Sequence, residues 1–483
     1  MTGMLEPIEI VLLGVILPFV EILGILTALH AIRTVRSSQA SIAWAVSLVT
    51  LPFLALPLYW VFGRNRFSGY VEAIRLGHDE HARQVDEILR RMKEEYRSDP
   101  GLVHTEFEVF ENLNRGYPFL RGNSAELLVD GEATFTRMFE DVDRARDYIL
   151  LQYYIVRDDE LGTDLKSRLI AKAKEGVRVY FLYDEIGCHK LPARYVDELA
   201  GAGVHIHPFG TTQGRGNRFQ LNFRNHRKIT VVDGRIGYVG GHNIGDEYVG
   251  RSPQFGHWRD THLRIDGPSV RHLQMSFLLD WTFAARTILA LNWDAAAPRR
   301  EGTDLLILGS GPADPMDTCS LMFVLAIQIA RERIWIASPY FIPNEAVIAA
   351  LRTAALRGVD VRIMLPLKPD HRIVYLACFS FMAELSEPNI RFFRYEPGFL
   401  HQKAFVVDER LAMVGTANAD NRSFRLNFEI SALTITRDFV REVAQMLASD
   451  FSRCREIPAD EGSTRGILFN EAVRLSRLFS PIL

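Results

Sequence analysis

Two copies of one short pattern carry the residues of this sequence that are best suited to chemistry. The pattern is H-x-K-x4-D-x6-G-x-x-N, and both copies keep every interval. A single H-x-K means little, but two equally spaced copies in one chain rarely arise by chance. The members are His226, Lys228, Asp233 and Asn243 in the first copy, and His401, Lys403, Asp408 and Asn418 in the second.

The spacing within each copy predicts a phosphate-binding pair. Residues 228–232 and 403–407 are apolar enough to form strands, and side chains two apart in a strand face the same side. Each histidine therefore projects beside its lysine, while Arg227 or Gln402 points away. The ammonium can neutralise phosphoryl oxygens, and the imidazole can attack phosphorus or move a proton.

The aspartate and the asparagine of each copy have different expected roles. The aspartate stands at the end of the strand, and we expect it to fix the following turn rather than touch a substrate. The asparagine lies where the next strand returns toward the site. We expect its amide to donate a hydrogen bond to a phosphoryl oxygen.

Two histidines that face one phosphate suit a two-step displacement. One neutral imidazole would attack phosphorus and form a phosphohistidine. The other, protonated, would donate to the leaving oxygen and then deprotonate the incoming alcohol. Such opposite protonation calls for a carboxylate behind each ring to orient and tune it. The candidates are Asp260 and Glu429, each near the start of a strand after its motif.

The elements around the motifs predict a duplicated α/β domain. Residues 148–156 read as a strand, 163–175 as an amphipathic helix that stops at Gly176, and 177–183 as a second strand. This βαβ pattern implies parallel strands and recurs before the second motif. We therefore expect two similar halves about a pseudo-twofold axis. Their predicted bounds are 124–298 and 299–483, with a linker near residues 295–302.

The first 66 residues predict a membrane anchor. Ile10–Ala31 and Ser37–Gly63 are each long and apolar enough to cross a bilayer as a helix. Together they predict a two-helix hairpin, followed by a polar linker-helix region at residues 67–123. Arg75 and further basic residues downstream favour a multi-pass protein of the cell membrane with a cytoplasmic main body.

Composition argues against several other functions. The formal net charge of −3 and the lack of a Lys/Arg run disfavour a nucleic-acid partner. The four cysteines are far apart and show no zinc-ligand spacing, so we expect no metal. The sequence also lacks a P-loop or Rossmann glycine fingerprint, and we expect no nucleotide cofactor.

Two groups of residues leave alternatives open. Arg224, Arg227, Arg422 and Arg425 flank the motifs and are either contacts for a second phosphate or surface charges. Residues 466–479 have an apolar helical face, which would either lie on a bilayer or pack on the domain.

The paired motifs resemble the HKD signature of the phospholipase D superfamily, over roughly residues 124–483. The resemblance implies that the two histidines, lysines and aspartates form a catalytic set that needs no metal. It also implies that His226 is the nucleophile and that His401 is the general acid and base. The symmetry of the two copies cannot make that assignment.

Longer segments narrow the resemblance to bacterial cardiolipin synthases. They are residues 240–248, 258–262 and 421–429, together with the two N-terminal spans. Gly241 replaces the Ser of many superfamily members, as in the synthase type, which argues against a nuclease. The resemblance implies phosphatidyl transfer between two phosphatidylglycerol molecules of an anionic membrane, giving cardiolipin and glycerol. The alternatives are a hydrolytic phospholipase D or a transferase that uses another alcohol.

Overall fold

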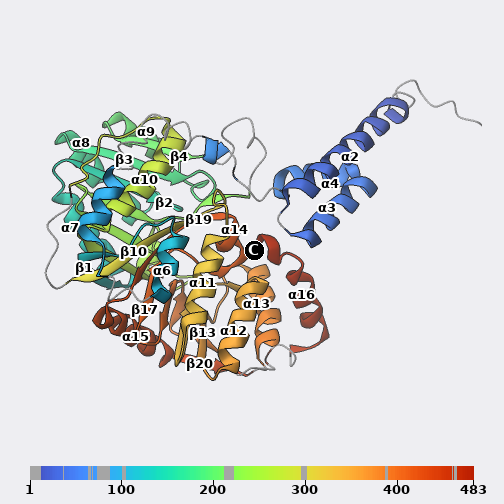
Figure 1. Cartoon of the computed structure of the whole chain (residues 1–483). Helices are drawn as coiled ribbons and strands as arrows, with labels where there is room; N and C mark the ends of the chain where they lie inside the picture. The colour runs from blue at the N-terminus through green and yellow to red at the C-terminus, as the bar shows by residue number, and fades with distance from the viewer. Residues whose placement is uncertain are drawn as a thin grey trace, which may run out of the picture. The chain divides into compact units, whose positions relative to one another are not determined.

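The computed structural model describes residues 12–35, 37–63, 67, 69–72, 87–99, 105–210, 222–294, 302–386, 390–458, 461 and 465–483. The chain divides into two compact units (Figure 1). One contains residues 1–71 and 211–223. The other contains residues 72–210 and 224–483 and carries both motifs.

The larger unit is built on one continuous mixed sheet whose strand order reads almost the same from either end. The first half runs from the edge to the centre as β4 (His205–Phe209), β3 (Arg178–Asp184), β2 (Tyr148–Tyr153), β6 (Ile229–Val232), β7 (Ile236–Gly240), β9 (Thr261–Asp266) and β1 (Leu120–Val129). The second half runs from the centre outwards as β10 (Thr303–Ser310), β19 (Asn427–Thr434), β17 (Leu411–Gly415), β16 (Ala404–Val407), β11 (Arg333–Ala337), β13 (Asp360–Pro366), β14 (Arg391–Tyr395) and β20 (Cys454–Ile457).

The two halves repeat one topology and join at the centre of the sheet. In each half three parallel strands lie next to an antiparallel group that contains the motif strand, which is β6 in the first half and β16 in the second. β1 and β10 pair antiparallel and close the sheet between the halves. The predicted duplicated α/β fold is therefore confirmed, and β20 is an extra edge strand of the second half.

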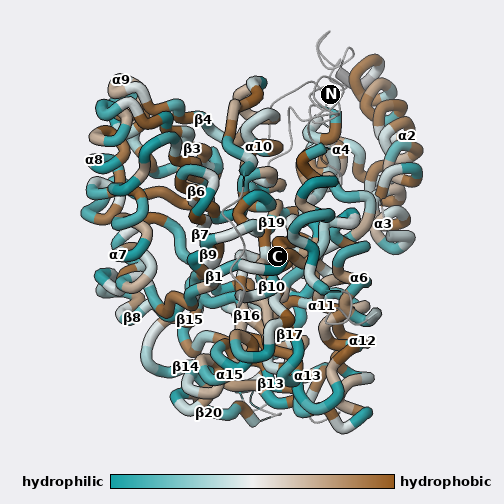
Figure 2. The backbone as a smooth tube through the Cα atoms, turned by 60° about the vertical axis from the view of Figure 1, so that its left-hand side comes forward, coloured by the Kyte–Doolittle hydropathy of each residue, from teal (hydrophilic) through white to brown (hydrophobic). Residues whose placement is uncertain are grey.

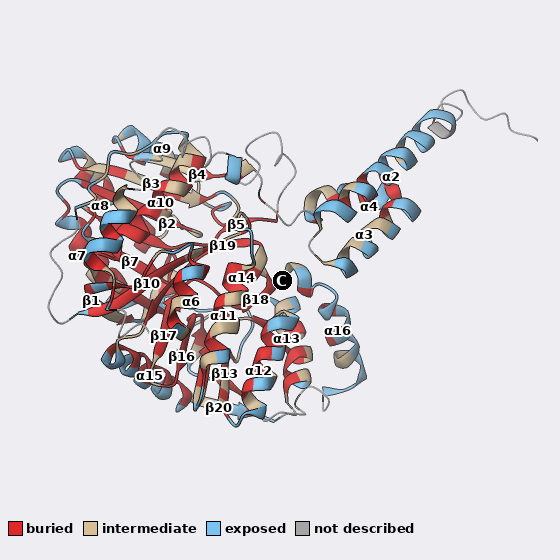
Figure 3. Cartoon of the chain, viewed as in Figure 1, coloured by how far each residue is buried: buried red, intermediate tan, exposed pale blue. Residues whose placement is uncertain are grey.

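Both faces of the sheet are buried, because alternate residues of one strand enter different cores. In β2, Ile149 and Leu151 belong to the core of the first half, whereas Tyr148 and Leu150 belong to a core that both halves share. Figure 2 shows hydrophobic residues on the strands and more hydrophilic residues on the outer helices, and Figure 3 shows the strands as mostly buried. The helices of the first core are α7 (Asp130–Asp143), α8 (Glu160–Lys174) and α9 (Ala193–Gly201); those of the shared core are α10 (Val270–Ala285) and α15 (Arg437–Phe451); and those of the second half are α6 (Thr105–Leu113), α11 (Thr318–Ile329), α12 (Glu345–Leu356) and α13 (Arg372–Leu385).

The crossover helices start and stop on the same signals in both halves. α8 follows Asp159 and α12 follows Asn344, and each of these side chains accepts a backbone N–H from the first turn. Each helix is followed by a glycine with positive φ, Gly176 at 90° and Gly358 at 87°. Local sequence thus places the ends of the helices that carry the chain back to the next parallel strand.

In the described part of the N-terminal unit, α2 (Leu17–Thr34), α3 (Ser38–Thr50) and α4 (Pro52–Phe62) pack against one another. Gly24 and Ala28 are among the small residues of α2 that are buried, so that α2 and α3 approach closely. The large residues face outwards instead, and Phe19, Ile22 and Leu26 are all more than half exposed. Small residues inside and large apolar residues outside are typical of helices that face lipid, which supports membrane association.

The second predicted span is not one helix, so that part of the prediction was wrong. Among the described residues, Gly14–Thr34 is the helix long and apolar enough to cross a membrane. The second segment breaks at Leu51, which has φ −134° and ψ 55°, immediately before Pro52. A residue before proline is disfavoured in the α conformation. Average hydropathy registers the apolar run but not this break.

Parts of two other predictions fall outside the described residues. Residues 87–96 of the predicted linker region are helical, but residues 73–86 and 100–104 are not described. Residues 295–301 of the predicted linker between the halves are not described either. The domain bounds at 123 and 298 therefore stay predictions.

Gly24→Leu should force α2 away from α3. A Cβ at Gly24 would lie 2.4 Å from the Leu48 carbonyl oxygen and 3.0 Å from Pro52 Cβ. We expect the detergent-solubilised protein to lose roughly 1–3 kcal/mol of stability, measured as a lower melting temperature. Gly14→Leu is the matched control, because a Cβ there meets nothing within 4 Å. Equal melting temperatures for the two variants would contradict this packing.

Candidate active site

A short parallel strand pair brings the first motif against the second half of the repeat. β5 (Arg224–Asn225) pairs with the start of β19. The His226 N–H continues the ladder by donating to the Phe428 carbonyl oxygen at 2.9 Å. The next residue is Glu429, whose Oε2 lies 2.9 Å from His226 Nδ1. A carboxylate of the second half therefore holds the histidine of the first.

The second motif is held in the same way from the opposite side. β15 (Gly398–Leu400) pairs in parallel with β8 (His257–Arg259). The His401 N–H donates to the Arg259 carbonyl oxygen at 2.8 Å, and the next residue, Asp260, places Oδ2 2.7 Å from His401 Nδ1. The predicted carboxylates thus lie behind the predicted histidines, and each pair crosses between the halves.

Glu429 is fixed by a dense set of hydrogen bonds. Besides His226, the donors are Thr416 Oγ1 at 2.5 Å, Ser423 Oγ at 2.9 Å and Asn427 Nδ2 at 3.1 Å. Burial acts to raise the pKa of this carboxyl, but the neighbouring histidine, lysine and hydroxyl outweigh burial and lower the pKa. Glu429 is therefore a fixed, ionised partner for the ring.

Asp260 is packed too tightly for a side chain at the neighbouring motif position. Its Oδ1 accepts the Thr261 N–H at 2.8 Å, and a Cβ at Gly241 would come within 1.9 Å of the same oxygen. The corresponding residue of the second copy is Thr416, whose hydroxyl binds Glu429. The glycine that departs from the common superfamily pattern therefore has a steric cause in this chain.

Both motif lysines are buried beside the histidines of their own motifs. Lys228 Nζ donates to the His226 carbonyl oxygen at 2.8 Å. Lys403 Nζ donates to the His401 carbonyl oxygen and lies 2.9 Å from the Nδ1 of that ring. Burial lowers the pKa of Lys228 to about 7 and that of Lys403 to about 8. Burial thus disfavours the charged form of each lysine, and a bound anion would stabilise that form.

The same burial keeps both histidines neutral. It lowers the pKa of His226 to about 4, although Glu429 acts in the opposite direction. Burial, followed by the charges of the two lysines, lowers the pKa of His401 well below its usual value. With Nδ1–H donated to a carboxylate, each neutral ring keeps a free electron pair on Nε2. That atom is the one available to attack phosphorus or accept a proton.

The motif aspartates fix backbone, in agreement with the role expected of them. Asp233 accepts the N–H groups of residues 146–148 at 2.8–3.0 Å. Asp408 accepts those of residues 331–333 at 2.9–3.0 Å. Each aspartate starts its turn at a positive φ, 53° and 52°. They tie each motif strand to the first strand of its βαβ unit.

The motif asparagines are both buried but differ in how they are used. Asn243 Oδ1 accepts the Ile155 N–H and its Nδ2 donates to the Tyr248 hydroxyl, both at 3.1 Å. Asn418 Oδ1 has no hydrogen-bond partner in the described part of the chain. Internal contacts therefore engage the first amide, and the phosphate contact expected of both asparagines stays a prediction.

Two acidic residues that the sequence analysis missed hold the residues between each histidine and lysine. Arg227 forms an ion pair with Asp280 of α10 at 2.8 Å, and Gln402 Nε2 donates to Asp450 of α15 at 2.9 Å. Arg227 and Gln402 are both buried and engaged by these carboxylates. Nothing in the motif spacing indicated these partners, because they come from helices that follow each motif by many residues.

The flanking arginines separate into two groups. Arg425 pairs with Asp317 at 2.9 Å, so it is occupied, as Arg227 is. Burial lowers the pKa of Arg422, and the charge of nearby Arg224 lowers that pKa further. Tyr154, which the motif pattern did not indicate, has its ring centroid 5.0 Å from that of His226. These groups border the first histidine.

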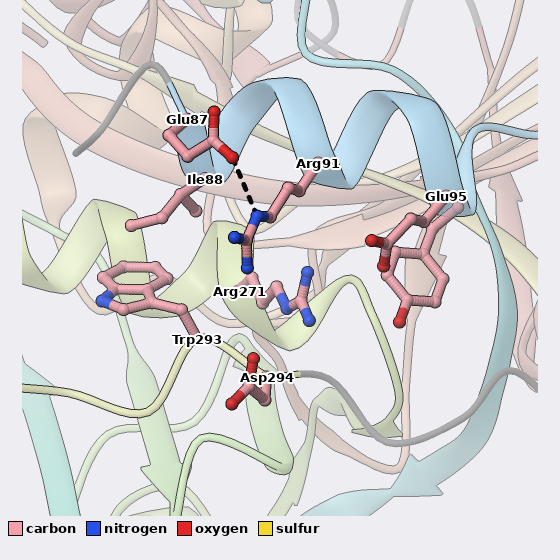
Figure 4. Close-up of a pocket in the computed structure, with 8 residues that line it drawn as sticks. Glu87, Ile88, Arg91, Glu95, Arg271, Trp293 and Asp294 are labelled. Atoms are coloured by element: carbon pink, nitrogen blue, oxygen red, sulfur yellow. Dashed lines mark hydrogen bonds and ion pairs between the residues drawn. The ribbon is translucent and has the colours of Figure 1, made fainter. Parts of the chain in front are cut away.

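A separate pocket of about 330 Å³ lies between the helix at residues 87–96 and the start of α10 (Figure 4). Its lining residues are Glu87, Ile88, Arg91, Glu95, Tyr96, Arg271, Trp293 and Asp294. The lining contains three carboxylates and two guanidinium groups, and no motif residue lines the pocket. Its charge is unfavourable for a phosphodiester, so this pocket is not the candidate active site.

Acid should destabilise this protein because buried neutral histidines must become charged. The pKa of His226 lies near 4 in the folded state and 6.5 is its ordinary value. The unfolded chain therefore binds more protons, and stability falls by about 3 kcal/mol for this residue as pH drops from 6.5 toward 4. We expect melting temperatures to fall over this window, less so in His226→Gln. Exposed His189 supplies the control variant, His189→Gln. Identical pH profiles for all three proteins would refute the neutral burial.

Comparisons with known proteins agree with this geometry. Residues 138–278 and 324–454 match the family model described as "Cardiolipin synthase, PLD-like domain". Residues 22–64 match the model described as "Phospholipase_D-nuclease N-terminal". The two longer matches lie in the two halves of the repeat, and each contains one motif.

Similar proteins cover almost the whole chain. Cardiolipin synthase A of Pseudomonas fluorescens strain Pf-5 and that of Pseudomonas putida strain GB-1 are each 48% identical over 472 residues, which is 97% of this chain and 98% of theirs. The crystal structure of phosphatidylserine synthase from Haemophilus influenzae Rd KW20 has a TM-score of 0.57 at 14% identity, covering 78% of this chain and 100% of that chain. That structure shows a shared fold. The chain belongs to the cardiolipin synthase family of the phospholipase D superfamily.

Proposed function

We propose that this chain is a membrane-associated phosphatidyltransferase that makes cardiolipin from two phosphatidylglycerol molecules and releases glycerol. The observation that carries the reaction type is the pair of crossed contacts, His226 with Glu429 and His401 with Asp260. Two oriented imidazoles and two buried ammonium groups suit a phosphodiester that is cut and remade. The relatives named cardiolipin synthase A support the choice of product.

The first half of the proposed reaction forms a phosphohistidine. Nε2 of His226 attacks phosphorus of the first phosphatidylglycerol while the bond from phosphorus to the glycerol headgroup oxygen breaks. His401, protonated once the anionic substrate is bound, gives its proton to that oxygen, and glycerol leaves. Lys228 and Lys403 stabilise the charge on the phosphoryl oxygens.

The second half of the proposed reaction reverses these roles. The free hydroxyl of a second phosphatidylglycerol attacks phosphorus and gives its proton to His401, while the bond to His226 breaks. Two phosphodiesters stand on each side of the overall reaction, so the exchange needs no energy source. Retaining the phosphatidyl group requires that water be kept from the intermediate.

The choice of His226 as nucleophile rests on the family resemblance and is supported by the surroundings of the two rings. Glu429 is fixed by four donors, so it orients His226 rigidly. His401 has Lys403 Nζ 2.9 Å from its Nδ1, and the charge of that lysine favours release of a proton from the ring. Membrane association is supported by the N-terminal apolar helix. We propose the cell membrane, with the larger unit on the cytoplasmic side.

Phosphatidylglycerol as the sole substrate tests the proposed function. We expect full-length protein in detergent micelles to produce cardiolipin and free glycerol in equal amounts, measured by mass spectrometry. His226→Ala and His401→Ala should each lower the rate by about 10⁴-fold or more. His189→Ala, at an exposed position outside the motifs, should keep the full rate. Phosphatidic acid as the only product would identify water as the acceptor and overturn the transferase.

The tight packing at Asp260 gives a second test. Gly241→Ser should displace Asp260, loosen its hold on His401 and lower kcat by about 10²-fold or more. Thr416→Ser is the matched control at the corresponding position of the other copy. It keeps the hydroxyl that binds Glu429, so kcat should change by less than about threefold. Equal kcat values for the two variants would contradict the crossed arrangement as a requirement for turnover.

A further inference from the structure

The last helix of the chain packs on the domain with only one of its two apolar faces. α16 (Ile467–Arg477) runs along α13, where the Phe469 ring lies 5.2 Å from Phe379 and Arg477 pairs with Glu384. Val473 and Ser476 are buried in this contact. The sequence left packing and bilayer contact as alternatives, and packing on α13 accounts for one face of the helix.

The opposite face is apolar and exposed. We call this surface the outer face of α16. It consists of Ile467 (81% exposed), Leu468 (88%) and Leu475 (61%) of the helix, together with Leu478 (73%) and Phe479 (49%) of the turn that follows. At 100° per residue, Ile467, Leu468 and Leu475 fall within roughly one third of the helix circumference. Leu478 and Phe479 follow in the turn after the helix. The charged side chain in the same sector is Glu471, which is paired with Arg474. Figure 3 shows α16 at the edge of the larger unit, with exposed residues along it. A helix on a soluble surface normally turns charged residues to this side.

Elsewhere in the described part of the larger unit, exposed large apolar residues are scattered. Leu356 at the end of α12 is 78% exposed, and it is the one exposed large apolar residue of that helix. Single exposures of this kind are common and need no explanation. A continuous group on one helix face is different, because such patches mark surfaces that contact a partner or a membrane.

The outer face is connected to the candidate active site through the end of the chain. The 3-10 helix η4 (Ser480–Ile482) follows α16 and lies against α14 (Asn421–Arg425), and Figure 1 marks the C-terminus beside α14. Asn421 Nδ2 donates to the Ser480 carbonyl oxygen, and Arg422 Nη1 donates to the Ile482 carbonyl oxygen, both at 3.1 Å. Ser423, also in α14, donates to Glu429. A surface that binds α16 would therefore also constrain the position of α14, which contributes a hydrogen bond to Glu429, the partner of His226.

Charge argues for apolar insertion rather than attraction to an acidic protein. The arginines around the outer face are Arg465, Arg474 and Arg477, and they pair with Glu461, Glu471 and Glu384 respectively. Since each cation is balanced, the helix adds little net charge. Buried apolar area is then the main source of binding energy.

We propose that the outer face of α16 lies in the interfacial region of the lipid bilayer and acts as a second membrane contact, separate from the N-terminal helices. The partner is the lipid monolayer itself, because the substrate of this enzyme family resides there and must enter from it. The contact holds α14, and with it the Glu429 side of the site, at the lipid surface. This inference does not depend on which lipid products form.

Lipid-borne quenchers test the contact without measuring activity. The chain carries three buried cysteines and a partly exposed Cys454, so Cys454→Ser supplies a background for labelling. We expect an environment-sensitive fluorophore on Leu475→Cys to be strongly quenched by doxyl-labelled lipids in phosphatidylglycerol and phosphatidylethanolamine vesicles that contain full-length protein. The same fluorophore on Leu356→Cys should remain unquenched. Equal quenching at the two positions would overturn the proposal.

Kinetics in vesicles give an independent test of the role of the contact. The double variant Leu475→Gln with Leu478→Gln keeps the buried face and the fold. It should raise the apparent KM for phosphatidylglycerol in vesicles by about tenfold and leave kcat in detergent micelles within about twofold. Leu356→Gln is the control and should change neither. An unchanged vesicle KM in the double variant would show that the outer face does not hold the enzyme on lipid. A loss of turnover in micelles as well would indicate damage to the site instead.

Discussion

The site depends on two short parallel strand pairs that cross between the halves of the repeat. Their register, rather than any long-range side-chain contact, sets His226 opposite Glu429 and His401 opposite Asp260. Main-chain hydrogen bonds from both histidine N–H groups continue these ladders. Because each histidine takes its carboxylate partner from the other half, the two copies of the motif form one candidate site and not two.

Burial makes the charge of this site unusually well balanced. With both lysines charged, Lys228 and Lys403 supply two positive charges against the two carboxylates Asp260 and Glu429, while both histidines are held neutral. A phosphodiester adds one negative charge to this set. Bringing one proton onto a histidine restores the balance, so binding of a phosphodiester and protonation of the proposed general acid would favour each other. The lowered pKa values of the lysines reflect the cost that an anion would relieve.

Membrane contact in this chain is served by two different kinds of apolar surface. The N-terminal helices bury small residues and expose large ones, as helices in lipid do. α16 has one apolar face on the domain and one in the open, as an interfacial helix has. The first kind attaches the chain to a membrane. The second fastens to α14 through η4 and so bears on the geometry of the site itself.

Sequence alone determined the parts of this protein that depend on local spacing. The interval from histidine to lysine to aspartate, the helix stop at Gly176 and the repeated βαβ order each depend on a short stretch of chain. Tertiary structure decided the rest. Asp260 and Glu429 could be named from the sequence as the carboxylates that orient the histidines. That each serves the histidine of the other half is set by β5 and β15, which are too short to be predicted from a sequence pattern. Asp280 and Asp450 had no signal, since helices far along the chain bring them to the motifs. The break at Leu51 was missed because hydropathy averages over a span, whereas proline acts on the single residue before it.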